Sequence, residues 1–152
     1  MFAITSGSIT TTSPVEEQVV EQIRDALASL GYQADLSDSG WGATTHVAPL
    51  KLKVALNEIW FKNYNWFFPI VPTWGDMKVT LVLENTGGKK LFEKSYEGGG
   101  NSLCLTGHCA FETATKEAMT EVLNKMTKDF SSQSVRDMVT AEYQSVPVAP
   151  TK

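Results

Sequence analysis

The sequence has little of what an enzyme centre or a membrane span requires. Its 152 residues include only two cysteines and two histidines, and neither histidine lies in a nucleophile motif. Thirteen basic residues face 17 acidic ones, and this net charge of −4 argues against a nucleic-acid or anionic-membrane surface. No continuous apolar run reaches the roughly 18 residues of a membrane span. Residues 1–13 lack the basic start and long apolar segment of a secretory signal.

The length and composition indicate one soluble globular domain. A chain of 152 residues with 42% hydrophobic content can bury one substantial core. We expect residues 1–13 to be a tether or an edge strand, residues 14–143 to form a single α+β domain, and residues 144–152 to be a flexible tail. No internal repeat divides the chain.

Two long helices and one short helix are predicted. Ser13-Pro14-Val15-Glu16 is typical of a helix start, with Ser13 as the N-cap and Glu16 closing a capping box. Apolar residues then recur every three to four positions until Gly31, which is expected to end the helix in a left-handed conformation. A similar apolar stripe predicts a second helix over residues 110–130, and a shorter helix is predicted over residues 134–143.

Alternating apolar residues predict an antiparallel β-meander over residues 50–61, 76–84 and 89–97, with Asn85-Thr86-Gly87-Gly88 as a turn whose glycines are free to take positive φ. The alternation changes parity at Asn57 and Glu58, so either a bulge lies there or the strand is buried on both faces. A short strand over residues 32–36 precedes the meander, and Gly98-Gly99-Gly100 is expected to be a mobile connector after it. One apolar face on each element predicts a two-layer sandwich, with both long helices on one face of the sheet.

This order of elements resembles the YajG-like family of bacterial lipoproteins from Val15 to Val139. The similar segments are the Leu30-Gly31-Tyr32 turn, the strand at residues 50–56, Lys94-Ser95-Tyr96, the helix at residues 118–126, Asp129 and the short helix at residues 135–139. The layout is also similar to that of the auxiliary lipoproteins of envelope transporters. The resemblance implies a secreted domain, periplasmic and tethered to the outer membrane by a lipidated cysteine upstream of this chain. It implies no cofactor and supplies no catalytic residues.

Residues 59–74 hold seven of the 15 aromatic side chains, in a segment predicted to be a hairpin turn. Turns normally carry small polar residues, so these rings either extend the core or face a partner. The candidate binding residues are Trp60, Tyr64, Trp66, Phe67, Phe68 and Trp74. Tryptophan and tyrosine often anchor protein interfaces. Shallow insertion into a bilayer is ranked lower, because Lys62 is the only basic residue among the rings.

Cys104 and Cys109 enclose four residues, a spacing that permits a disulfide or leaves two loop thiols. His108 and the distant His46 complete a theoretical metal set, but the spacing matches no usual zinc pattern. We therefore predict no metal and no catalytic residue. The predicted function is a non-enzymatic, lipoprotein-like binding module that contacts an envelope protein or itself through residues 59–74. The alternatives are an accessory protein that holds a lipid or other apolar ligand between sheet and hairpin, and an enzyme that uses either cysteine.

Overall fold

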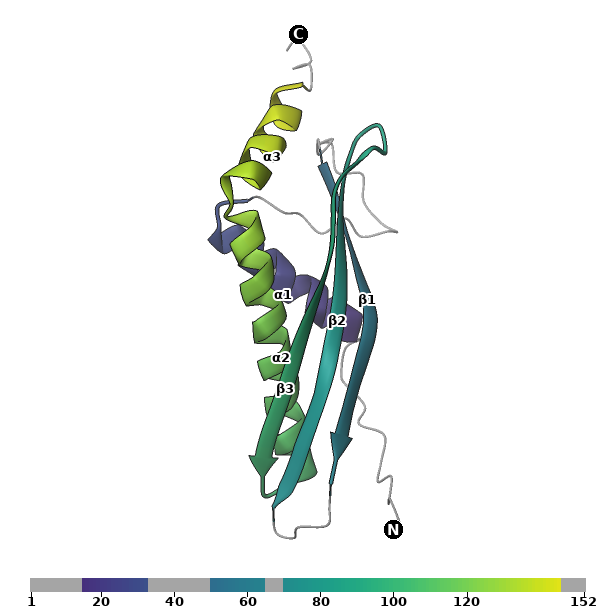
Figure 1. The fold of residues 1–152 in the computed structure, drawn as a ribbon, viewed down its shortest axis with the longest axis vertical. Coiled ribbons are helices and arrows are strands. Elements are labelled where there is room, and N and C mark those ends of the chain that lie inside the picture. The colour runs from purple at the N-terminus through teal and green to yellow at the C-terminus, as the bar shows by residue number, and fades with distance from the viewer. Residues whose placement is uncertain (1–14, 33–49, 65–69, 146–152) are drawn as a thin grey trace.

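The computed structural model describes residues 15–32, 50–64 and 70–145, which form three helices and three strands. The strands make one antiparallel sheet in the order β1-β2-β3. The elements are α1 (Val15–Ser29), β1 (Leu50–Asn63), β2 (Val71–Asn85), β3 (Lys90–Cys104), α2 (Gly107–Phe130) and α3 (Gln133–Ser145). Figure 1 shows both α1 and α2 on one side of the sheet, with α3 continuing beyond the end of α2. The predicted α+β sandwich is confirmed.

Helix α1 ends as its sequence predicts. Gly31 has a φ of +89°, its N–H donates to the Ala28 carbonyl at 3.0 Å, and the Tyr32 N–H donates to the Leu27 carbonyl at 3.1 Å. These two bonds define a Schellman motif, in which glycine at the left-handed position satisfies the last carbonyls of the helix. The Ser13 cap and residues 33–36 of the predicted short strand lie outside the described residues.

The parity change in β1 is a bulge at Asn57. Leu56 pairs with Val79 and Glu58 pairs with Lys78, so Asn57 has no counterpart on β2. The extra residue reverses the faces of the strand. Ile59 beyond the bulge therefore packs against the core, although the core-facing positions before it are even-numbered.

The glycine run was predicted wrongly as a mobile connector, because it lies inside β3. Gly98 and Gly100 face α2, and a Cβ on either would overlap a backbone carbonyl of the helix, that of Ala118 or Ala114. Both alanines are fully buried. The glycines therefore allow a close approach of strand and helix, a packing role that local sequence does not distinguish from flexibility.

Side chains of α2 also bond to the outer edge of β3. Glu121 accepts the Gly99 N–H at 2.8 Å, and Glu117 accepts the Asn101 N–H at 2.7 Å. Lys125 donates to the Glu97 carbonyl at 2.7 Å. These backbone groups have no neighbouring strand in the described sheet. The helix thus closes an edge that would otherwise be open to another chain.

A polar cluster fixes the C-terminal half of α2 to β3. The Asp129 carboxylate accepts the buried Tyr96 hydroxyl at 2.9 Å and the Lys94 ammonium at 2.6 Å. Burial raises the pKa of Asp129, but these two bonds and the positive charges of Lys94 and Lys128 together outweigh it, so the net pKa is lowered. The predicted family resemblance rested partly on these three residues, and here they have a structural role.

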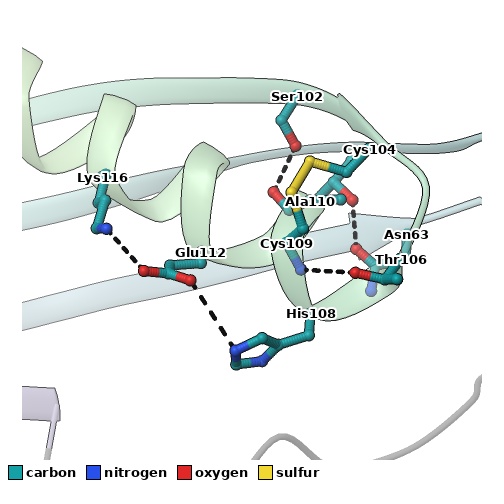
Figure 2. The surroundings of a disulfide bond; sticks show 10 residues. Asn63, Ser102, Cys104, Thr106, His108, Cys109, Ala110, Glu112 and Lys116 are labelled. Atoms are coloured by element: carbon teal, nitrogen blue, oxygen red, sulfur yellow. Dashed lines mark hydrogen bonds and ion pairs between the residues drawn. A yellow bond between two sulfur atoms is a disulfide. The ribbon is translucent and has the colours of Figure 1, made fainter.

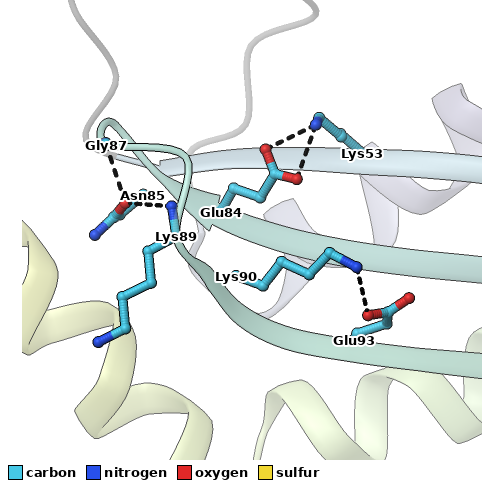
Figure 3. A network of polar contacts seen from close by, with 7 residues as sticks. All are labelled: Lys53, Glu84, Asn85, Gly87, Lys89, Lys90 and Glu93. Atoms are coloured by element: carbon cyan, nitrogen blue, oxygen red, sulfur yellow. Dashed lines mark hydrogen bonds and ion pairs between the residues drawn. The ribbon is translucent and has the colours of Figure 1, made fainter.

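A tight turn joins β2 to β3, as Figure 3 shows. The Asn85 side chain accepts the N–H groups of Gly87 and Lys89, both at 3.0 Å, and Gly88 has a φ of +77°. The predicted glycine turn is therefore confirmed. Exposed ion pairs beside it, such as Lys90 with Glu93 at 2.9 Å, contribute little to stability.

Candidate binding surface

The strands extend further into the aromatic stretch than predicted. β1 continues to Asn63 and β2 begins at Val71, so Trp60 and Trp74 lie on strands rather than in the turn. Trp66, Phe67 and Phe68 lie outside the described residues. The sequence predicted a hairpin with aromatic residues at its tip, over residues 59–74. In the structure, most of the aromatic residues described in this range lie on the strands of the sheet instead.

The stretch is divided between the two faces of the sheet. Phe61 faces α2 and meets Phe111 edge to face, with ring centroids 5.4 Å apart. It also covers Gly75, its partner on β2, where a Cβ would overlap the Phe61 ring. Trp60, its neighbour, is exposed on the opposite face. Both predicted interpretations, core extension and surface presentation, therefore apply to different residues.

Three exposed aromatic side chains stand together on the face that α1 and α2 leave uncovered. Trp60 is 37% exposed, Tyr64 43% and Trp74 41%. Tyr64 and Trp74 stack with centroids 4.2 Å apart and planes inclined by 13°. The Lys62 ammonium lies 5.4 Å from the centre of the Trp60 ring. Rings held by strands and by each other lose little side-chain freedom when a partner binds.

Leu103 belongs to the same surface and was missed by sequence reasoning. Leu103 is 73% exposed and pairs with Pro72 on β2. The carbonyl of Pro72 in turn accepts the Tyr64 N–H, so Leu103 and Tyr64 flank the same residue. Continuing the alternation of β3 through the glycines would have placed it on this face. Ending the predicted strand at Glu97 concealed it. Trp60, Tyr64, Trp74 and Leu103 are called the outer-face patch below.

A polar hollow adjoins the patch. It has an empty volume of about 430 Å³ including open solvent, and its lining comprises Glu58, Trp60, Asp76, Met77, Lys78 and Glu97. Lys78 bonds to Glu97 at 2.6 Å, and this bond lowers the pKa of Glu97. Glu58 is exposed, as expected for a residue that the bulge turns toward solvent.

Cys104 and Cys109 form a disulfide, with sulfur atoms 2.14 Å apart and Cα atoms 5.9 Å apart. Figure 2 shows that it joins the end of β3 to the first turn of α2. The helix begins at Gly107, earlier than the predicted residue 110. Thr106 is its N-cap, and its hydroxyl accepts the Cys109 N–H at 3.2 Å.

The disulfide removes the thiolates that a metal or a nucleophilic mechanism would use. His108 is exposed, and its Nε2 lies 3.9 Å from the nearest Glu112 oxygen. Across residues 15–32, 50–64 and 70–145, no three His, Cys, Asp or Glu side chains are grouped to hold a metal ion. His46 lies outside these ranges. Within the same ranges, no helix is long and apolar enough to cross a membrane.

Comparisons with known proteins give only a weak structural similarity. No family model matches the sequence, and no curated protein matches it. Among solved structures, the chain is similar to "a putative lipoprotein from Caulobacter crescentus CB15", with 16% sequence identity and a TM-score of 0.46. The alignment covers 84% of this chain and 82% of that chain. A similarity this low carries no argument about function, and the resemblance to YajG-like lipoproteins stays a prediction.

Proposed function

We propose that this chain is a non-enzymatic, lipoprotein-like binding module of a bacterial cell envelope. It contacts a protein partner, or a second copy of itself, through the outer-face patch. The observation that supports this most directly is the joint exposure of Trp60 and Trp74 on strands and of Tyr64, which follows β1 and stacks on Trp74. Tryptophan and tyrosine are enriched among the residues that dominate binding energies at protein interfaces.

The disulfide supports a compartment outside the cytoplasm, because disulfides persist in oxidising surroundings. Anchoring in the outer membrane through a lipidated cysteine upstream of this chain is part of the proposal. The full-length open reading frame tests it. A signal sequence that ends in a cysteine just before this chain supports the anchor, and a different leader overturns it.

The absence of enzymatic activity is proposed on the chemistry of the described residues. The two cysteines are bonded to each other and have no thiolate to attack a substrate. A thiol reagent added to the folded, unreduced protein is expected to modify no cysteine. A fast-reacting thiol would instead restore the cysteine enzyme as the leading candidate.

No observation favours the apolar-ligand alternative among the described residues. The hollow beside the patch is lined mainly by charged side chains, and its cavity volume is about 180 Å³. Small-molecule pockets are usually about 300–1,000 Å³ and mostly apolar. An acyl chain would find neither the space nor the lining there.

Substitution of Trp74 by alanine tests the patch. Chemical cross-linking in the intact envelope, together with sedimentation of the purified protein, reports contact with a partner or with a second copy. Trp74→Ala is expected to lose the cross-linked product or the dimer. Tyr143→Ala is the matched control, because Tyr143 is also exposed but lies on α3, away from the patch.

Thermal unfolding separates binding from folding. Trp74 packs on Tyr64 at the surface, so its loss should destabilise the domain by about 1 kcal/mol, the value of one aromatic pair. Cross-linking that survives in Trp74→Ala, or that is lost equally in Tyr143→Ala, would refute the assignment.

A further inference from the structure

The hollow beside the outer-face patch has an excess of negative charge. It is lined by the carboxylates of Glu58, Asp76 and Glu97 and by the single ammonium of Lys78. Lys78 bonds to Glu97. The Asp76 carboxylate has no hydrogen bond or ion pair with any described residue, and Glu58 has only the longer-range attraction of Lys78. Two of the three carboxylates are thus available to a ligand.

An aromatic ring forms one wall of this hollow. Trp60 pairs with Asp76 across the two strands, and Gly99, on the other side of Asp76, presents no side chain on this face. The ring already attracts the Lys62 ammonium at 5.4 Å, a distance typical of a cation–π contact. Even when Lys62 is counted with Lys78, the three carboxylates of the hollow outnumber the two ammonium groups near it.

We infer that the hollow receives a lysine or arginine side chain of the protein partner, while the outer-face patch packs against apolar residues of the same segment. This inference rests on the proposed function and specifies that the partner's contacting segment is positively charged. Complementary charge beside an apolar patch selects the partner more than it adds affinity. An anionic bilayer is disfavoured because it would bring like charge to Glu58 and Asp76.

Two short peptides test the inference with the whole chain. The first is acetyl-Leu-Arg-Leu-Arg-Leu-amide, and the second replaces both arginines by glutamate. Binding is followed by the shift of the Trp60 indole N–H resonance, identified with Trp60→Phe. The arginine peptide is expected to bind at least about threefold more tightly, the effect of one exposed ion pair. This preference should shrink with added salt.

Asp76→Asn assigns the preference to the hollow. It should weaken the arginine peptide by about threefold and leave the glutamate peptide unchanged or tighter. Glu93→Gln is the matched control, because Glu93 loses the same charge on the same strand set but pairs with Lys90 at the far end of the sheet. It should change neither peptide.

The outcomes separate this inference from the proposed function. Equal binding of both peptides, lost in Trp74→Ala, would overturn the cationic partner and keep the patch as a binding surface. Binding of neither peptide, or no difference between Asp76→Asn and Glu93→Gln, would overturn the inference as well. Sedimentation showing that the wild type buries the patch against a second copy would replace the basic partner by that copy.

Discussion

Replacing Gly100 by alanine tests whether close packing holds α2 on the sheet. The added methyl group would overlap the backbone carbonyl oxygen of Ala114 and crowd the Ala118 nitrogen. These atoms belong to the main chain of a helix and cannot move aside alone. The helix must lift from β3, and the neighbouring contact between Gly98 of the strand and Ala118 of the helix must open with it.

The magnitude follows from the nature of this obstacle. Overpacking a core usually destabilises a protein by about 1–3 kcal/mol, and a collision with backbone belongs at the upper end. We expect a loss of about 3 kcal/mol in the free energy of unfolding. For a domain of this length, each kcal/mol changes the melting temperature by about 2–4 °C, so Tm should fall by about 6–12 °C.

The adjacent Gly99 supplies a matched control. A Cβ at Gly99 would point to the opposite face, with the Asp76 Oδ1 at 3.3 Å and the Glu121 Oε2 at 3.9 Å as its nearest contacts. Both are ends of flexible side chains. Gly99→Ala should therefore change stability by less than about 1 kcal/mol, and it can even stabilise the strand. Calorimetry of both variants is the measurement, and equal melting temperatures would refute the packing argument.

Two further predictions concern polar and covalent links. Asp129→Asn should lower the free energy of unfolding by about 1–2 kcal/mol at pH 7, because the carboxylate bonds to Tyr96 and Lys94. The pKa of Asp129 is lowered in the folded protein, so this stability is present above about pH 4 and is lost as the pH falls through that lowered pKa. Urea unfolding at pH 7 and at pH 3 should show the difference between the two proteins shrink. Replacing Cys104 and Cys109 together by serine should lower the free energy of unfolding by about 2 kcal/mol or less, because the disulfide closes only a small ring. Urea unfolding of the variant, and of the wild type with and without reductant, measures the loss. An unchanged urea midpoint would contradict the prediction.

Features set by neighbouring residues could be predicted from sequence. The Gly31 helix end, the Asn85 turn and the bulge at Asn57 each depend on a few consecutive positions with a known backbone preference. The amphipathic stripe of α2 likewise predicted which side chains are buried, including Ala114, Ala118 and Val122. From these elements the two-layer arrangement follows, because each must bury one apolar face.

The end of β3 could not be predicted, because its reason lies in another element. A glycine run has no side chain to reveal which face it presents, and only the approach of Ala114 and Ala118 gives Gly98 and Gly100 a packing role. The same error concealed Leu103, three residues beyond Gly100. Of the six predicted binding residues, the structure places Trp60, Tyr64 and Trp74 together on one exposed face.

The bulge at Asn57 decides which aromatic residues are exposed on the outer face of the sheet. A regular strand would continue the even-numbered core positions of β1, which would turn Trp60 toward α2 and Phe61 toward solvent. The unmatched residue reverses that assignment, so Phe61 packs on Phe111 and Trp60 stands above the sheet beside Asp76. One extra residue in β1 therefore produces both the closed core at this end and the exposed ring beside the carboxylates.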